Sequence, residues 1–388
     1  MERALITYGW NRVAYIVNRT LAEHGIETHV GDVSGITMNR WSRWTHRHFT
    51  YPSFFDNPEA FLNRIITYAT EHEIPYFFPT HEETLIASKY QNTLKQAGIK
   101  TLLPSFESIK TAHLKDKTMA LAQQLGVPTP TSIVPFTETE ALSFFEAFPK
   151  PIVLKYHQSN SSKGVFFLKD RQDLHQHIPN LGQFSLQEYV QGDGFGVCLL
   201  YNQDAQLRAS FTHKRLQEKL VSGGTSTLRI STQHAELEAH AKRLLSALNW
   251  VGPAMVEFKV NPLTNQLWLM EINPRLWGSL ALPYHCGLHF PWLMYSILKH
   301  GDVAPQTDYT KNIRVKWVLG SVLATLSYGL AKKRFSPTFL TASAEGYDDV
   351  WSDDVGCFLG EIANYGARFL KARQLNPTAQ TQFDITKL

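Results

Sequence analysis

The fold of this chain is decided by two short stretches, Met255-Val-Glu-Phe-Lys259 and Trp268-Leu-Met-Glu-Ile-Asn-Pro-Arg-Leu-Trp-Gly-Ser279. The apolar runs that contain them are separated by Asn261-Pro-Leu-Thr-Asn265, whose asparagines and proline are turn residues. The pattern therefore predicts a hairpin of two buried strands. Each strand carries one acidic residue among apolar neighbours.

These two acids, Glu257 and Glu271, give the hairpin its chemistry. Side chains alternate between the two faces of a strand, so Asn273 shares a face with Glu271, and a hairpin can bring Glu257 beside them. Burying both acids without a cation would be costly. Oxygen ligands that converge in this way are typical of Mg²⁺ bound together with nucleotide phosphates, which makes all three residues candidate metal ligands. Arg275, just beyond, has the planar guanidinium that grips phosphates and carboxylates.

Composition excludes several classes of protein. The chain has 388 residues, 43% hydrophobic and 19% charged, as expected for a globular protein of two or three domains. A net charge of +4 does not indicate a nucleic-acid binder. The three separated cysteines indicate neither a disulfide framework nor a zinc site, and no signal peptide is visible, so we expect a cytoplasmic protein. The apolar segment within residues 317–334 is too short to span a membrane; we expect a packing helix, with an interfacial helix as the alternative.

The N-terminal residues predict a strand–helix–strand unit of a parallel sheet, with the helix over Asn11–His24. Only Gly9 stands where a dinucleotide-binding loop carries three glycines, so a nicotinamide or flavin site is excluded. Further along, Thr80 and Glu83 have the spacing of a capping box for the following helix. Substrate contact by His81 or Glu82 is the alternative reading of that stretch.

Two adjoining segments have features of phosphate binding. Pro151–Lys155 reads as a buried strand that ends in a lysine, and such a lysine needs a negative partner, which a phosphate would supply. Ser159–Gly164 follows before the next strand, and its small residues can expose backbone N–H groups as an anion-binding nest.

The set Glu257, Glu271-Ile-Asn-Pro-Arg275 and Trp277-Gly-Ser279 resembles the metal-binding core of the ATP-grasp superfamily. The nearest members in pattern are carbamoyl-phosphate synthase large subunits, biotin carboxylases and ATP-grasp carboxylate–amine ligases. The resemblance covers nearly the first 300 residues and implies an α/β and α+β fold. We expect a Rossmann-like pre-ATP-grasp domain over 1–112 and an ATP-grasp domain over 113–303, followed by a C-terminal extension of unknown role over 304–388. Two subdomains, 113–188 and 189–303, would clamp ATP between them.

The resemblance also implies site residues. Lys117 would contact the nucleotide phosphates, although Lys115 is a close alternative. The hinge at 188–190 would pair with adenine, and Asp193, or a residue next to it, would bind the ribose; a plain hairpin over 185–201 is the alternative. Lys214 and Arg215, together with Arg275, would hold the γ-phosphate and an acyl phosphate, and the glycines at 223 and 224 resemble a substrate-side loop. The implied nucleotide contacts are Lys117, Lys155, Ser161, Ser162, Lys163, Gly164, Glu188, Tyr189, Val190 and Asp193.

The activity implied by the resemblance is that of an ATP-dependent ligase. It would activate a carboxylate as an acyl phosphate on Mg-ATP (Mn²⁺ being an alternative metal), join it to an amine, and release ADP and phosphate. The partners would be a small-molecule carboxylate and amine, with no nucleic acid, and a homodimer stays open as an assembly. A bicarbonate-activating enzyme resembling a carboxylase or carbamoyl-phosphate synthase is one alternative. A nucleotide-binding protein without turnover is the other.

Overall fold

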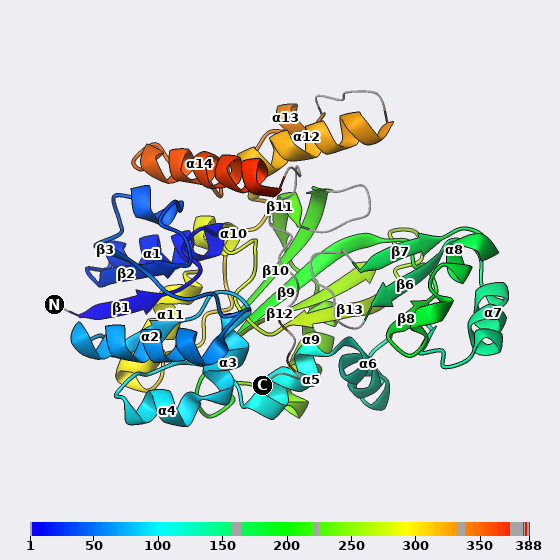
Figure 1. Ribbon diagram of the computed structural model, residues 1–388, viewed down its shortest axis with the longest axis horizontal. Helices are drawn as coiled ribbons and strands as arrows, with labels where there is room; N and C mark the ends of the chain where they lie inside the picture. Colours follow the sequence, from blue (N-terminus) through cyan, green and yellow to red (C-terminus); the bar gives the residue numbers. More distant parts are fainter. Residues whose placement is uncertain are drawn as a thin grey trace.

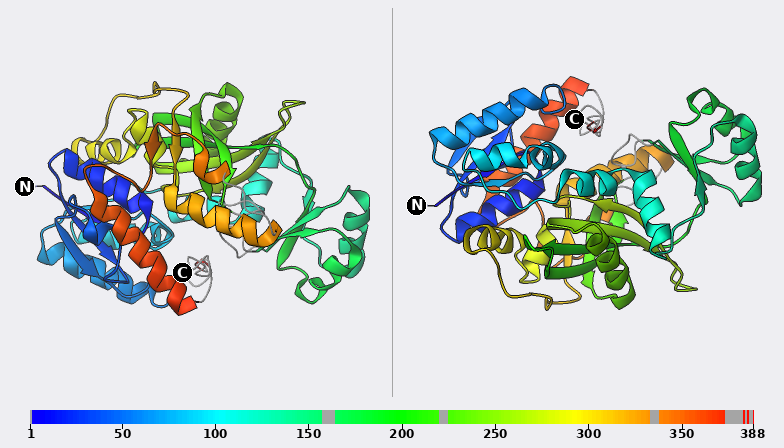
Figure 2. Two further views of the ribbon diagram at one scale, coloured as in Figure 1. Left: turned by 90° about the horizontal axis from the view of Figure 1, so that it is seen from above. Right: turned by 90° about the horizontal axis from the view of Figure 1, so that it is seen from below.

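The computed structural model describes residues 2–156, 164–219, 225–332 and 338–372, together with Phe383, Ile385 and Leu388. Three sheets organise the described chain: a parallel sheet of four strands, an antiparallel sheet of four, and a mainly antiparallel sheet of seven. The parallel sheet and the small antiparallel sheet lie at opposite ends of the molecule, with the seven-stranded sheet between them (Figures 1 and 2). The predicted α/β and α+β class is confirmed.

The N-terminal part is a Rossmann-like layer of alternating strands and helices. Its elements are β1 (Arg3–Ile6), α1 (Arg12–Glu23), β2 (Glu27–Asp32), η1 (Asn39–Trp41), β3 (Arg47–Thr50), α2 (Pro58–Glu71), β4 (Tyr76–Phe78), α3 (Glu83–Lys89) and α4 (Gln91–Gln96). The strands pair in parallel in the order β3-β2-β1-β4. The predicted first helix is confirmed: Asn11 caps it by accepting a hydrogen bond from the backbone N–H of Val13.

The small antiparallel sheet forms a lobe of its own. After α5 (Phe106–His113) and α6 (Lys115–Gln124), it contains β5 (Ser132–Ile133), α7 (Glu138–Ala147), β6 (Ile152–Tyr156), β7 (Val165–Leu168), α8 (Arg171–His175), η2 (Ile178–Asn180) and β8 (Phe184–Gln187). The strand order is β5-β8-β6-β7. Phe145, Leu154 and Phe184 belong to a separate buried cluster that holds this lobe together.

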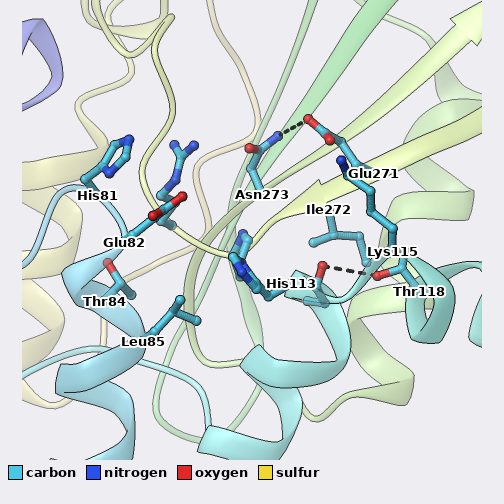
Figure 3. A pocket seen from close by; sticks show the side chains of 13 residues that line it. His81, Glu82, Thr84, Leu85, His113, Lys115, Thr118, Glu271, Ile272 and Asn273 are labelled. Atoms are coloured by element: carbon cyan, nitrogen blue, oxygen red, sulfur yellow. Dashed lines mark hydrogen bonds between the residues drawn. The ribbon is translucent and has the colours of Figure 1, made fainter. Parts of the chain in front are cut away.

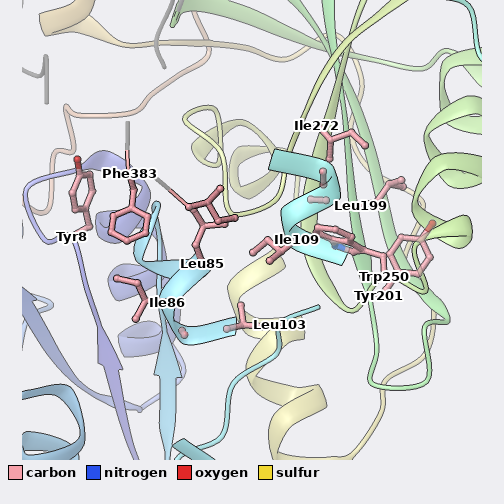
Figure 4. Packing of buried hydrophobic residues seen from close by; sticks show 14 of the residues in the cluster. Tyr8, Leu85, Ile86, Leu103, Ile109, Leu199, Tyr201, Trp250, Ile272 and Phe383 are labelled. Carbon is pink, nitrogen blue, oxygen red and sulfur yellow. The ribbon is translucent and has the colours of Figure 1, made fainter. Parts of the chain in front are cut away.

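The large sheet carries the predicted hairpin. It starts with β9 (Asp193–Tyr201), β10 (Leu207–Glu218), β11 (Ser226–Thr232), α9 (Ala235–Ala247), β12 (Gly252–Val260) and β13 (Leu267–Asn273), followed by α10 (Ala281–His285) and α11 (Phe290–His300). β12 and β13 pair antiparallel, so the hairpin is confirmed. Its inner face shares one core with the N-terminal layer, in which Leu85 and Ile109 pack in the same cluster as Trp250 (Figure 4).

The C-terminal residues extend the large sheet rather than standing apart from it. They form β14 (Arg314–Lys316), α12 (Val318–Lys332), α13 (Thr338–Thr341), β15 (Gly346–Tyr347) and α14 (Val355–Ala372). The full strand order is β13-β12-β9-β10-β11-β14-β15. The helices α12 and α14 lie along one outer side of the molecule, and α14 contacts η1 of the N-terminal layer (Figures 1 and 2). Among the described residues, no helix is long and apolar enough to cross a membrane.

Local contacts bear on two of the alternatives from the sequence. The capping box at Thr80 forms only in half: the Glu83 carboxylate accepts the backbone N–H of Thr80, but the Thr80 hydroxyl donates to the carbonyl of Thr7 instead. Glu83 therefore fastens the start of α3 to β1, and it also accepts the hydroxyl of Thr7. The plain hairpin over 185–201 is excluded, because β8 and β9 belong to different sheets and residues 188–192 cross between them.

Candidate functional site

The two acids of the hairpin face each other. Glu257 and Glu271 are directly paired across β12 and β13, next to a β-bulge at Met270, where the register shifts by one residue. Asn273 shares their face and donates from Nδ2 to Oε1 of Glu257 at 2.9 Å and to Oε1 of Glu271 at 3.5 Å. The structure thus brings together the three residues that the sequence analysis predicts to be metal ligands.

Arg215 completes this cluster from a strand farther away. Its Nη2 lies 2.5 Å from Oε2 of Glu257, and its Nη1 lies 3.4 Å from Oε1 of Glu218. To reach the hairpin from β10, the side chain crosses β9, where Gly194 leaves room for it: a Cβ on Gly194 would lie 3.1 Å from Cδ of Arg215. Gly194 therefore allows the Arg215 side chain to pack closely across β9.

The electrostatics of the cluster favour a cation. Burial raises the pKa of Glu257 to about 7, against the lowering effect of Arg215, and the negative charge of Glu271 raises it further. One arginine is thus shared among three carboxylates, those of Glu257, Glu271 and Glu218. Oxygen ligands on a half-buried strand pair suit Mg²⁺, which typically takes only one or two carboxylates and completes its shell with water and phosphate. No group of three or more His, Cys, Asp or Glu side chains among the described residues is placed to hold a metal ion, so phosphate oxygens would have to complete the shell.

Lysines surround the same hairpin. Lys155, at the end of β6 in the small lobe, has its pKa lowered to about 8 by desolvation and by the positive charges of Lys115 and Lys259, while Glu271 opposes the shift. Lys259 follows Glu257 by two residues on β12, and its Nζ donates to the carbonyl of Val190 at 3.1 Å. Cations from both lobes therefore face the hairpin, as a polyphosphate would require.

Lys115 and Lys117 differ in their surroundings. Both lie in the first turn of α6, but Lys115 lines a cavity together with Glu271, whereas Lys117 is exposed and does not line it. Figure 3 shows Lys115 extending toward Glu271. Of the two alternatives, the geometry favours Lys115; the phosphate contact of Lys117 stays a prediction.

Lys214 and Arg215 point to opposite faces of β10, because consecutive strand residues alternate. Only Arg215 reaches the hairpin. Lys214 forms an ion pair of 2.6 Å with Asp193, the first residue of β9. The roles predicted for Lys214 and Asp193 in nucleotide binding stay predictions. Their ion pair does not involve the acids of the hairpin, so their position does not support these roles.

The predicted hinge lies between the two sheets. The Glu188 carboxylate accepts the backbone N–H of Thr131 at 2.7 Å, Tyr189 is exposed, and the carbonyl of Val190 receives Lys259. Gly164 precedes β7, and its carbonyl accepts the N–H of Tyr156. Of the predicted phosphate loop, Ser161, Ser162 and Lys163 lie outside the described residues, and so do the glycines of the predicted loop at 223 and 224.

A cavity leads from the hairpin to the N-terminal layer. Its walls come from the start of α3, the α5–α6 junction and the end of the hairpin (Figure 3). Arg275 lines it, with its Nη1 donating to the carbonyl of Leu276; the turn that carries it is anchored by Trp277, which is 0% exposed. The lining residues are His81, Glu82, Thr84, Leu85, Ala112, His113, Lys115, Thr118, Glu271, Ile272, Asn273, Pro274 and Arg275.

Sequence reasoning missed two charged residues at this site, Lys259 and Glu218. The position of Lys259 could have been predicted, because a residue two positions after Glu257 lies on the same face of the strand. The position of Glu218 could not, since its approach to Arg215 depends on a register shift between β10 and β11.

The arrangement of a small β-lobe, a crossing segment and an acidic hairpin agrees with a comparison to known families. The family model for the ATP-grasp domain matches residues 114–279. The chain contains an ATP-grasp domain. The match begins at the last residue before α6 and ends at Ser279, so the ATP-grasp domain includes both the small lobe and the hairpin. The N-terminal layer and the C-terminal strands lie outside it, and the resemblance seen in the sequence is confirmed.

Relatives of the ATP-grasp domain are distant in sequence. The arginine-specific large chain of carbamoyl phosphate synthase from Bacillus subtilis is 24% identical over 205 residues, which are 49% of this chain and 20% of the relative. The chain thus spans about a fifth of the length of the curated relatives it matches. Among solved structures, N5-carboxyaminoimidazole synthetase from Staphylococcus aureus, complexed with ADP, has a TM-score of 0.66 at 15% identity, covering 85% of this chain and 86% of that one. An L-amino acid ligase from Bacillus licheniformis has a TM-score of 0.58 at 17% identity, covering 77% and 74%. The solved structures show the fold alone.

Proposed function

We propose that this chain is an ATP-dependent ligase that activates a carboxylate on Mg-ATP and joins it to an amine. The observation that carries the proposal is the hairpin cluster: Glu257, Glu271 and Asn273 on one face, with Arg215 against them and a cavity beginning beside them. A nucleotide-binding module has no need for this full set, whereas phosphoryl transfer depends on such positioning and charge neutralisation. The carbamoyl phosphate synthase and amino acid ligase among the related proteins support the same class of reaction.

The reaction has two steps whose atoms balance. A carboxylate oxygen attacks the γ-phosphorus of ATP, the bond from that phosphorus to the β,γ-bridging oxygen breaks, and ADP leaves with the electron pair. The nitrogen of an amine then attacks the acyl carbon, the bond from this carbon to the phosphate oxygen breaks, and inorganic phosphate leaves while the nitrogen loses a proton to solvent. No protein nucleophile takes part.

The residues of the site have distinct tasks in this scheme. Glu257, Glu271 and Asn273 would hold Mg²⁺, which when bound neutralises charge on the phosphates. Lys155 and Lys115 would lie against the phosphate oxygens from the small lobe and from α6. Arg215 lies against Glu257 and Arg275 lines the cavity beside the hairpin, so their charges would stabilise the transferred group.

The direct test is release of ADP from Mg-ATP in the presence of carboxylic acids, with hydroxylamine as a general amine. Hydroxylamine converts an acyl phosphate into a hydroxamate, so the acid can be identified before the natural amine is known. We expect ADP and hydroxamate to form in equal amounts with at least one acid. Tight ATP binding without ADP formation across all classes of acid would contradict the proposal.

A second candidate is activation of bicarbonate, which is favoured by the similar fold of a biotin carboxylase domain from Hydrogenobacter thermophilus that was solved with MgADP and bicarbonate. The same assay separates it from the first. ADP release that needs bicarbonate and no other acid would establish it, whereas ADP release that needs an organic acid and is unaffected by bicarbonate depletion would exclude it.

A further inference from the structure

Between residues 355 and 370, the exposed positions of α14 carry no polar side chain. The other exposed positions of this stretch are a glycine and an alanine. A helix on the surface of a globular protein normally turns its apolar stripe to the core and a polar face to water. Helical spacing places the large exposed residues, each 41–69% exposed, in one stripe along α14: Val355, Leu359, Ile362, Phe369 and Leu370.

The stripe continues onto a loop of the N-terminal layer. Among the described residues of that layer, the exposed large apolar side chains are Val33, Ile36 and Trp41. Two contacts place their loop against α14. Nδ2 of Asn364 donates to the carbonyl of Ile36, and a Cβ on Gly356 would collide with the carbonyl oxygen of Trp41.

The neighbouring helix α12 enlarges this apolar surface. It lies on the same outer side of the molecule as α14, and both helices are on the near side when the molecule is seen from above (Figures 1 and 2). Its Val322 and Leu326, one turn apart, are each 38% exposed. Single exposed apolar residues are normal, but a continuous surface of them marks an interaction site.

The exposed charges beside the stripe are positive. Arg40 and Arg43, in the loop that contacts α14, are both exposed. Each donates to a backbone carbonyl, and among the described residues neither forms an ion pair. The carboxylate of Asp353 nearby is already held by Arg19 through two contacts of 2.9 Å. The acid of α14, Glu361, is buried.

This charge pattern decides which partner fits. In a symmetric pair of copies the face would meet itself, so its arginines would find no free carboxylate opposite them. An anionic bilayer supplies phosphates for the arginines and hydrocarbon for the stripe. An exposed tryptophan beside the arginines also fits a bilayer, because tryptophan is favoured at the level of the headgroups.

We propose that α14 and the adjoining loop at 33–43 bind the surface of a bilayer that contains anionic lipids. The helix would lie in the plane of the membrane, with its stripe toward the acyl chains and with Trp41, Arg40 and Arg43 at the headgroups. At 1.5 Å per residue the stripe from Val355 to Leu370 is about 22 Å long. This binding is independent of the proposed ligase activity.

The test is sedimentation of the full-length protein with lipid vesicles. One set contains phosphatidylcholine alone, and in the other about a third of the lipid is phosphatidylglycerol. We expect affinity for the anionic vesicles to be at least about tenfold higher, because each arginine near an anionic surface contributes about fivefold. This difference should shrink as the salt is raised from about 0.1 M to 0.5 M, because salt screens the charges. Equal affinity for the two sets would overturn the inference.

A pair of substitutions assigns binding to the stripe. In the double variant Leu359→Gln/Ile362→Gln we expect affinity for the anionic vesicles to fall at least about tenfold, because two apolar side chains no longer enter the membrane. The matched control is Leu263→Gln/Phe136→Gln, whose side chains are 91% and 73% exposed on other parts of the molecule. All four residues are exposed, so thermal unfolding should be nearly unchanged in both variants. An equal fall in the control would refute the assignment to α14.

A single substitution tests the positive edge. We expect Arg40→Gln to lower affinity for the anionic vesicles about fivefold and to leave affinity for phosphatidylcholine unchanged. Arg243→Gln, which changes an exposed arginine on α9, is the control and should have no effect. Absence of binding to the anionic vesicles would overturn the inference. If the protein then has the mass of a dimer in solution, and Leu359→Gln/Ile362→Gln that of a monomer, the face binds a second copy instead.

Discussion

Two buried clusters of acids and arginines lie in different parts of the seven-stranded sheet, and they use charge differently. The hairpin cluster is Glu257, Glu271 and Arg215 on β10, β12 and β13. The clasp, as we call the second, consists of Arg12, Arg229 and Asp348, near β11, β14 and β15. In the hairpin pair the side chains of Arg215 and Glu257 are 17% and 13% exposed, whereas in the clasp those of Arg229 and Asp348 are 0% and 1% exposed.

The two clusters also differ in their balance of positive and negative charges. In the clasp Asp348 accepts from Arg229 and from Nε of Arg12 at 3.2 Å, and Nη1 of Arg12 lies 4.0 Å from Oε1 of the buried Glu361, so the ion pairs join two arginines to two carboxylates. The Arg12 guanidinium also stacks 3.5 Å from the Trp317 ring. In the hairpin cluster the acids outnumber the arginine. Buried ions that their neighbours neutralise serve structure, and a buried surplus of one sign needs a ligand of the other sign. The comparison therefore predicts that removing an acid lowers catalytic activity in the hairpin cluster and lowers stability in the clasp.

The largest expected effect is on catalysis, from Glu271→Ala. We expect ATP turnover to fall at least about 1000-fold, because the metal site loses one of its two carboxylates. We expect the melting temperature to stay the same or rise, because removal of one of two adjacent negative charges relieves repulsion on Glu257. ADP release and thermal unfolding of the same preparation measure the two effects.

The control for Glu271→Ala is Glu236→Ala, which changes an exposed glutamate in the first turn of α9. Turnover close to the unmodified protein in Glu271→Ala would remove the basis for the metal site. A large loss of stability would instead show that Glu271, like Asp348, serves the fold.

The reverse pattern is expected for Asp348→Asn in the clasp. The substitution leaves the buried Arg229 guanidinium without its carboxylate and leaves Arg12 with Glu361 alone at 4.0 Å, and breaking such a buried pair costs about 3–5 kcal/mol of unfolding free energy. The activity of the folded fraction should be unchanged, because Asp348 does not line the cavity beside the hairpin. Denaturant unfolding and the KM for ATP separate the two outcomes.

The matched control for this change is Asp353→Asn. Asp353 pairs with Arg19 through two contacts of 2.9 Å, but its side chain is 38% exposed, so we expect a loss of at most about 1 kcal/mol. Equal losses in the two variants would mean that burial does not set the strength of the clasp.

The same contrast explains what could be predicted from the sequence. Glu257, Glu271 and Asn273 lie within 17 residues, so turn residues and strand alternation were sufficient to bring them together. The clasp joins Asp348 to residues 119 and 336 positions away, and no local pattern carries such a contact. The role of Asp348 is therefore visible only from the packing of three chain segments. The cavity beside the hairpin belongs to the same class, because Glu82 and Arg275, which both line it, come from distant parts of the chain.

Alternation also has a limit at Lys214 and Arg215. Strand alternation predicts that the two side chains point to opposite faces of β10. Which of these faces holds Glu257 depends on how β10 pairs with β9 and how β9 pairs with β12, and the sequence does not give these registers. Which lysine of α6 faces the cavity is likewise decided by how α6 docks beside β13 rather than by the residues themselves.

The smallest expected effect is a pH dependence that only the hairpin region should show. Lys155 has its pKa lowered to about 8 by desolvation and by neighbouring lysines, so its amine loses its charge at a pH where a solvated lysine keeps it. Because a neutral amine cannot balance a phosphate, ATP affinity should be full below the pKa and should fall about tenfold over the one pH unit above it. Calorimetric titration with a non-hydrolysable ATP analogue and Mg²⁺ measures this fall. In Lys155→Arg the guanidinium stays charged throughout, so the affinity should be flat over the same range. A fall of equal size in Lys155→Arg would assign the titration to another group and leave Lys155 without a role in phosphate binding.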